Sequence, residues 1–123
     1  MKFVHVTLSV KDLEASLRFY QDVVGLEITR RFSSGSNSEI VFLSSGDTQV
    51  ELISRPGQDV AEPGRGISMG FETQSLEDTM ALVKEKGFET DGEISSPNPS
   101  VRFFFASDPD GYRVQFVHSE AEQ

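Results

Sequence analysis

The feature that most constrains this sequence is that its first half is repeated, in pattern, in its second half. Residues 5–26 (HVTLSVKDLEASLRFYQDVVGL) align with residues 67–88 (ISMGFETQSLEDTMALVKEKGF). Each segment begins like a strand, passes a polar cap, continues as an amphipathic helix and ends at a glycine, Gly25 or Gly87. Residues 40–53 match residues 103–117 in the same way. A period near half the chain indicates one supersecondary unit used twice.

The two expected helices carry their apolar residues at matching positions. The first has a stripe spaced i, i+4, i+7, i+11, which is typical of a helix with one buried face. The second repeats the first three of these positions 63 residues later, and a polar residue precedes each helix as a cap. The stripes are Leu13, Leu17, Tyr20 and Val24 in the first helix, and Leu76, Met80 and Val83 in the second.

Alternation in two of the predicted strands separates an apolar face from a polar one. In residues 3–10 the valines and Leu8 face the helix, and the intervening residues face away from it. In residues 48–53, Val50 and Leu52 share one face. The pattern therefore predicts that the face away from the helix carries an imidazole, hydroxyls and a carboxylate. These residues are His5, Thr7, Ser9, Gln49 and Glu51.

The other segments complete a βαβββ order in each half, which predicts an α+β fold. Strands are expected at 26–32, 40–43, 101–106 and 112–118, with a flexible hairpin loop at 33–38, a stiffer loop at 95–100 and a tight DPDG turn at 108–111. We expect one domain over residues 1–123. It comprises unit one at about 1–54, a linker at about 55–66 that is rich in Gly and Pro, and unit two at about 67–123.

Composition narrows the function classes. The 123 residues include 20 acidic and 11 basic side chains, which gives a formal net charge of −9. Nucleic acids and anionic membrane surfaces require a basic face, so neither is an expected partner. The chain contains no cysteine, which excludes disulfides, thiolate metal ligands and a cysteine nucleophile. With no apolar run of membrane-spanning length, a cytoplasmic location is the expectation.

The repeated βαβββ plan, the opening HVTLSV, the VELI strand and the DPDGYRVQFV segment together resemble the vicinal oxygen chelate superfamily. That superfamily includes glyoxalase I (lactoylglutathione lyase), methylmalonyl-CoA epimerase, ring-cleaving dioxygenases, and the fosfomycin and bleomycin resistance proteins. The plan is closest to a bacterial lactoylglutathione lyase-like protein. The resemblance implies two tandem units that form a curled mixed sheet around a cleft.

The resemblance also implies where a metal would bind. The family's ligands lie on the first and last strands of each unit, which correspond here to His5, Glu51, Ser68 and Gln115. A bacterial glyoxalase I would have His, Glu, His and Glu in that order. A serine hydroxyl is a poor ligand for transition metals and an amide oxygen is a fair one. The expected metal ligands are therefore His5, Glu51 and Gln115, for Ni²⁺, Zn²⁺, Mn²⁺ or Fe²⁺.

Catalysis and substrate binding follow from the same resemblance. In glyoxalase I, the glutamate that corresponds to Gln115 of this chain moves a proton, and the carboxamide of a glutamine cannot do this. Glu51 is the candidate that would take over the role, with Thr7, Ser68 and Arg113 lining the substrate pocket. For Glu51 the alternatives are a structural ion pair with Arg102 or Arg113, or simple exposure to solvent.

Three functions stay open on the sequence. The first is a metal-dependent lyase or isomerase of the lactoylglutathione lyase type, acting on a small oxygenated substrate or thiol adduct. The second is a non-catalytic small-molecule binder like the bleomycin resistance proteins, for which an acidic surface suits a cationic ligand. The third is a superfamily member with altered chemistry. The resemblance further implies a homodimer, with the two units paired within one chain or across two chains.

Overall fold

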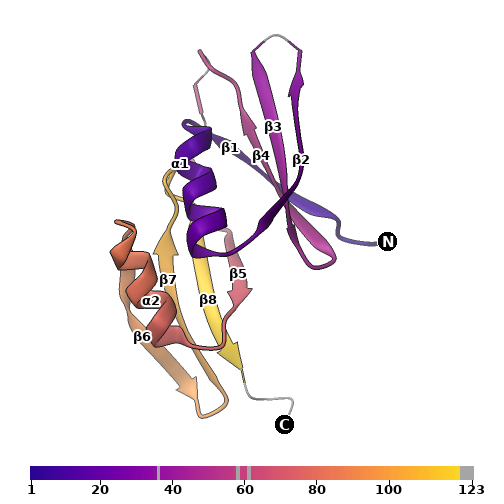
Figure 1. The fold of residues 1–123 in the computed structure, drawn as a ribbon. Helices are drawn as coiled ribbons and strands as arrows, with labels where there is room; N and C mark the ends of the chain where they lie inside the picture. Colours follow the sequence, from indigo (N-terminus) through magenta and orange to yellow (C-terminus); the bar gives the residue numbers. More distant parts are fainter. Residues whose placement is uncertain (36, 58, 61, 120–123) are drawn as a thin grey trace. The chain divides into compact units, whose positions relative to one another are not determined.

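A computed structural model describes residues 1–35, 37–57, 59–60 and 62–119. The chain divides into two compact units, Met1–Glu62 and Pro63–Gln123. Each unit contains one four-stranded mixed sheet and one helical segment, in the order βαβββ (Figure 1). The predicted α+β class and the repeated order are therefore confirmed. No helix in these described ranges is long and apolar enough to cross a membrane.

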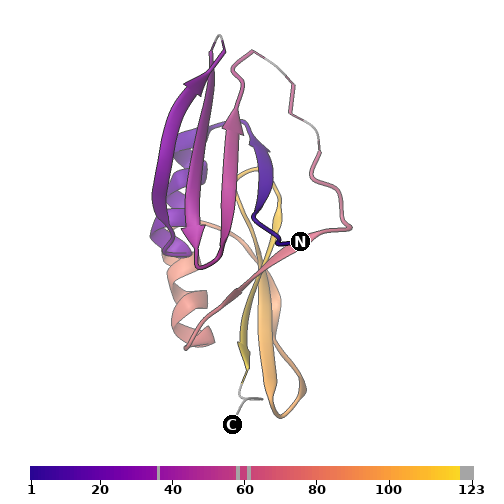
Figure 2. The same cartoon turned by 90° about the vertical axis from the view of Figure 1, so that its right-hand side faces the viewer.

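The first unit is a sheet of order β1-β4-β3-β2, in which β1 pairs with β4 in parallel and the other pairs are antiparallel. A helical segment covers one face of this sheet (Figure 2). The core forms between them, because alternate strand residues such as Leu8, Val41 and Leu52 meet Phe19 and Tyr20 of the helical segment. The elements are β1 (His5–Val10), α1 (Leu13–Leu17), η1 (Arg18–Val23), β2 (Glu27–Ser34), β3 (Ser38–Ser45) and β4 (Thr48–Ser54).

The second unit repeats this plan with the sheet order β5-β8-β7-β6, again with the first and last strands parallel. Leu76 and Val83 of the helix are buried against Phe104, Val114 and Phe116 of the strands. The Ser75 side chain caps the helix by accepting a hydrogen bond from the Asp78 backbone N–H at 3.2 Å. The elements are β5 (Ser68–Glu72), α2 (Leu76–Glu85), β6 (Thr90–Asn98), β7 (Val101–Ser107) and β8 (Arg113–Ser119).

The helical segment of the first unit changes its hydrogen-bond pattern halfway along. After α1 the chain forms the π-helix η1, where the Val24 N–H donates to the Phe19 carbonyl five residues earlier at 3.1 Å. A π turn contains more residues than an α turn, so it changes which side chains face the sheet. Val23 is therefore buried, and Val24 is only half-buried. The predicted stripe was therefore wrong at Val24, because it assumed 3.6 residues per turn to the end of the helix.

Because of this wider turn, the helical segment of the first unit contains one more residue than the helix of the second unit. Leu13 precedes Gly25 by 12 positions (25 − 13), and Leu76 precedes Gly87 by 11 (87 − 76). The closing hydrogen bonds show the same difference. Leu26 N–H reaches the Tyr20 carbonyl six residues back, whereas Phe88 N–H reaches a carbonyl five residues back. Both glycines take the left-handed conformation that was expected at the helix end, with φ of 88° and 86°.

The loops predicted at 33–38 and 95–100 are shorter than expected. β2 continues to Ser34 and β3 begins at Ser38, and β6 continues to Asn98. Pro97 is compatible with β6 because this strand lies at the edge of its sheet and its pairing with β7 is irregular. Residue 36 of the first loop lies outside the described residues.

The DPDG segment forms the expected tight turn between β7 and β8. Asp108 is buried, and its Oδ1 atom accepts hydrogen bonds from the backbone N–H groups of Asp110 and Tyr112, each at 2.9 Å. The Gly111 N–H closes the turn on the Asp108 carbonyl at 3.0 Å, and Gly111 has a φ of 95°, which favours glycine. This turn fixes the register in which β8 returns along β7.

Candidate functional site

Each sheet has one face covered by the helix and one that the helix does not cover, which we call the helix-free face. In β4, Val50 and Leu52 are buried on the helix side, so Gln49 and Glu51 lie on the helix-free face. His5 and Thr7 share that face from β1, since Leu8 and Val10 are the buried residues of this strand. The sequence predicted this separation correctly.

The helix-free face of the first unit brings an imidazole, a carboxylate and a hydroxyl together. Thr7 lies opposite Glu51 in the parallel register, and its hydroxyl donates to Glu51 Oε1 at 2.5 Å. His5 Nε2 lies 3.5 Å from the same oxygen. The Glu51 side chain is only 12% exposed, whereas that of His5 is 39% exposed. The carboxylate is therefore held in one position and largely withdrawn from water, next to an accessible imidazole.

Aromatic rings surround this polar group. Phe42 of β3 lies opposite Glu51, and its ring meets the His5 ring edge-to-face at 5.6 Å between centroids. Phe32 of β2 stacks on Phe42 at 6.5 Å, and the Arg30 guanidinium lies over both rings at 5.0 and 5.1 Å. The sequence analysis did not select Phe42, although alternation from the buried Val41 and Leu43 could have placed it on this face.

The helix-free face of the second unit carries different chemistry at the equivalent positions. Ser68 and Arg113 are partners in the β5–β8 register, as are Gly70 and Gln115. Gly70 has no side chain to fill the space beside Gln115, whose Oε1 would lie 3.4 Å from a Cβ at that position. The Arg113 guanidinium lies 3.9 Å from the Phe105 ring centroid, and its Nη2 lies 3.6 Å from Asp91 Oδ2.

The four positions that the resemblance assigned to a metal therefore hold an imidazole, a carboxylate, a hydroxyl and an amide. Transition metals bind strongly to the first two groups and weakly to the others. Glu51 Oε1 already accepts a hydrogen bond from Thr7. The part of the chain that the structure describes contains no group of three or more His, Cys, Asp or Glu side chains that could hold a metal ion. This donor set does not fit a four-ligand metal centre of the glyoxalase I type, and the assignment of His5, Glu51 and Gln115 as ligands stays a prediction.

The ion pairs considered as an alternative for Glu51 form elsewhere. Arg102 pairs with Glu77, and Arg113 pairs with Asp91. Glu51 instead has the Thr7 hydroxyl and His5 as its neighbours. The carboxylate therefore remains available on the helix-free face as a hydrogen-bond acceptor or a base.

Comparisons with known proteins agree with this fold. A model of the Glyoxalase/Bleomycin resistance protein/Dioxygenase superfamily matches residues 2–116. A protein of Haemophilus influenzae named lactoylglutathione lyase is 29% identical, over 98% of this chain and 95% of its own. A probable lactoylglutathione lyase of Synechocystis is 26% identical, over 100% of this chain and 99% of its own.

Two solved structures illustrate the range of proteins that share the fold. The trypanothione-dependent glyoxalase I of Leishmania major has a TM-score of 0.84 and 21% identity, covering 99% of this chain and 89% of that one. TnmS3, an antibiotic binding protein from Streptomyces sp. CB03234, has a TM-score of 0.74 and 21% identity, covering 98% and 97%. At these identities the likeness shows the fold alone.

Proposed function

The chain belongs to the glyoxalase/bleomycin resistance protein/dioxygenase superfamily, and on that premise we propose that it is a binding protein for a small oxygenated molecule. The observation that carries the proposal is the donor set of the second unit. Ser68 and Gln115 present a hydroxyl and an amide where a metalloenzyme of this family would have strong metal ligands. These groups bind neutral or anionic oxygen atoms of a ligand by hydrogen bonds.

The surroundings of these groups favour a ligand that also has a flat apolar part. Arg113 is held over Phe105, and Phe103 meets Phe105 edge-to-face at 5.8 Å. The first unit has an aromatic pair of its own, Phe32 and Phe42, on its own helix-free face. Aromatic side chains with a few convergent polar groups are typical of small-molecule sites. The antibiotic binding protein TnmS3 has the same fold.

Measuring how much metal the protein retains distinguishes a metal-free binding protein from a metal-dependent enzyme. Protein purified without a polyhistidine tag would be incubated with Ni²⁺, Zn²⁺, Mn²⁺ or Fe²⁺, desalted and assayed for metal. The proposal expects retention far below one ion per chain, since two strong donors seldom hold a transition metal. The variant Ser68→His/Gln115→Glu puts strong donors at all four positions that the resemblance assigns to a metal, and it is the positive control. Near-stoichiometric retention by the unmodified protein, abolished by His5→Ala, would overturn the binding proposal.

Ligand binding itself is tested by thermal shift with flat polyoxygenated compounds and with a cationic antibiotic of the bleomycin type. A ligand that binds only the folded protein raises the unfolding temperature, and the increase grows with the ratio of ligand concentration to Kd. The variants Arg113→Gln and Phe105→Leu should reduce the shift, whereas Arg65→Gln, in the segment that precedes β5, should not. A shift that Arg113→Gln and Phe105→Leu leave unchanged would remove the helix-free face of the second unit as the binding surface.

The second candidate function is a lyase or isomerase of the lactoylglutathione lyase type, and the geometry around Glu51 favours it. A carboxylate with little exposure, oriented by a hydroxyl and next to an imidazole, is suited to move a proton between adjacent carbons of a substrate. Turnover of the methylglyoxal–glutathione hemithioacetal, lost in Glu51→Gln, is the expected result. Full turnover in Glu51→Gln would exclude Glu51 as the proton carrier.

Assembly and location stay predictions. The homodimer that the resemblance implies is tested by analytical ultracentrifugation at micromolar concentration, where a monomer would remove any site shared between two chains. The cytoplasmic location is tested by fractionation of the source cells.

A further inference from the structure

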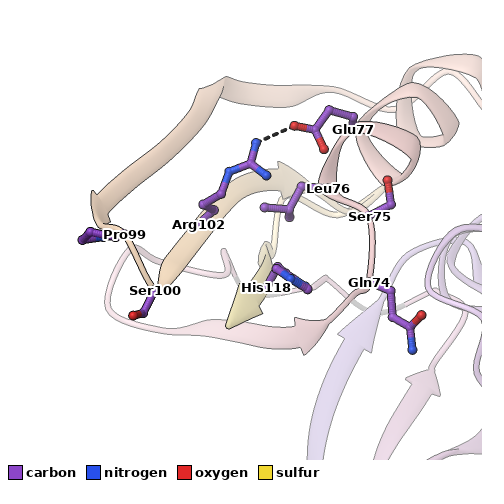
Figure 3. A pocket seen from close by; sticks show the side chains of 8 residues that line it. All are labelled: Gln74, Ser75, Leu76, Glu77, Pro99, Ser100, Arg102 and His118. Carbon is purple, nitrogen blue, oxygen red and sulfur yellow. Dashed lines mark hydrogen bonds and ion pairs between the residues drawn. The ribbon is translucent and has the colours of Figure 1, made fainter. Parts of the chain in front are cut away.

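The second unit contains a cavity of about 140 Å³ on the helix side of its sheet, which we call the corner pocket (Figure 3). It lies where the start of α2, the β6–β7 turn and the end of β8 meet. Arg102 and His118 alternate with Gln115 and Phe105 along their strands, so they lie on the opposite face from the candidate site described above. The residues that matter here are Gln74, Leu76, Glu77, Pro99, Arg102 and His118.

Two basic side chains define the chemistry of the pocket. Arg102 and His118 are direct cross-strand partners in the β7–β8 ladder. His118 Nδ1 lies 3.0 Å from the Thr73 carbonyl oxygen and therefore donates to it, which fixes the ring. Arg102 Nη2 donates to Glu77 Oε2, a bond that uses only part of a guanidinium with five N–H donors (Figure 3).

The equivalent corner of the first unit shows how such a guanidinium is neutralised there. Arg31 Nε donates to Glu39 at 2.5 Å and Arg31 Nη2 donates to Glu14 at 2.9 Å, so one cation faces two carboxylates. Glu14 is the repeat equivalent of Glu77 (14 + 63), and Glu39 is the equivalent of Arg102 (39 + 63). The second unit thus has one carboxylate fewer and a basic side chain in its place.

We propose that the corner pocket binds a small organic carboxylate, which supplies the second carboxylate that the guanidinium has in the first unit. The carboxylate would accept from Arg102 and from the Gln74 amide beside the His118 ring, while Leu76 and Pro99 contact a short hydrocarbon part. The volume of about 140 Å³ is that of roughly four to five water molecules at liquid density, which suits an acid of a few heavy atoms. The proposal does not depend on the function proposed for the helix-free face.

The local electrostatics support this reading. The hydrogen bond from Arg102 is the main cause that lowers the pKa of Glu77, followed by a backbone hydrogen bond and, last, by the charges of Arg102 and His118. The potential that stabilises this carboxylate would act on a second one bound beside it. Planar guanidinium groups bind carboxylates through two parallel N–H donors, which favours a carboxylate over a spherical anion such as chloride.

The test is a titration of the full-length protein with acetate, propionate and inorganic phosphate, each against chloride at equal ionic strength. Binding is followed by backbone amide shifts in a proton–nitrogen correlation spectrum. The proposal expects saturable shifts at residues 74–77, 100–102 and 118 with the two carboxylates. Shifts that do not saturate, or tighter binding of phosphate than of either carboxylate, would overturn the assignment.

Variants separate a ligand site from a merely structural ion pair. Arg102→Gln should weaken propionate binding about tenfold or more, since a hydrogen bond to a charged group is lost. Arg31→Gln, which removes the matched cation of the first unit, should leave the affinity unchanged. Glu77→Gln should tighten binding, because it removes the carboxylate that competes for Arg102. Unchanged affinity in Glu77→Gln would refute the proposal even if Arg102→Gln fails to fold.

Discussion

The β7–β8 turn allows a quantitative test, because one buried carboxylate holds it closed. Asp108 is 4% exposed, and its Oδ1 accepts from two backbone N–H groups at 2.9 Å. A hydrogen bond to a charged acceptor contributes about 1.5–3 kcal/mol, and two bonds that share one oxygen contribute less than twice that. Asp108→Ala should therefore lower the free energy of unfolding by about 2–4 kcal/mol.

Two further variants make this prediction specific. Asp108→Asn keeps one oxygen acceptor but removes the charge and replaces the other oxygen with an NH2 group, so it should cost about 1 kcal/mol. Asp47 occupies the corresponding turn of the first unit but is exposed, and Asp47→Ala should change stability by no more than about 0.5 kcal/mol. Urea unfolding monitored by circular dichroism gives all three values. Equal losses in Asp108→Ala and Asp108→Asn would show that the shared acceptor oxygen does not hold the turn.

Three other predictions follow from the packing and the ion pairs. The pKa of Glu77 is lowered in the folded state, so its pairing with Arg102 stabilises the protein above the unfolded-state pKa. This stabilisation is lost as the pH falls through the folded-state pKa. In urea unfolding, Glu77→Gln should therefore lose less stability on acidification than the unmodified protein does. Arg31→Gln should cost about 0.5–1 kcal/mol in low salt and less in high salt, since this side chain is 38% exposed. Phe104→Ala should cost about 3–5 kcal/mol in calorimetry, whereas Phe105→Ala on the opposite face should cost clearly less, and equal losses would contradict the assignment of faces.

The sequence predicted those parts of the fold that depend on periodicity and on local chemistry. Alternation placed His5 and Glu51 on one face, and the strand pairing then brought them within 3.5 Å of each other. The caps, the helix-end glycines and the DPDG turn were also correct, because each is determined by residues close in sequence. The π-helix over Arg18–Val23 was not predicted, because the expected stripe assumed 3.6 residues per turn throughout.

Contacts between residues that are far apart in the sequence were the hardest part of the structure to predict. The Arg113–Asp91 and Arg102–Glu77 pairs join segments 22 (113 − 91) and 25 (102 − 77) residues apart, and periodicity does not specify such partners. His118 lies on the face of β8 opposite Gln115, as strand alternation requires. The structure shows it half-buried, with its ring bonded to the Thr73 carbonyl, because α2 begins directly above it.

Differences in length between the helices and between the turns of the two units determine which of their residues are equivalent. The offset between equivalent residues is 63 at the helix start, 62 at the glycines and 64 in the last strand. A constant offset of 63 would match Glu51 with Val114, which is buried beneath the helix. An error of one residue in the offset would therefore replace Gln115, a candidate ligand, with the core residue Val114. The extra position lies in the turn before the last strand: residues 45–48 separate the partners Ser44 and Gln49, whereas residues 108–112 separate the equivalent partners Ser107 and Arg113. A shift of one residue along a strand moves a side chain to the other face of the sheet, so this turn has to be counted before the two helix-free faces are compared.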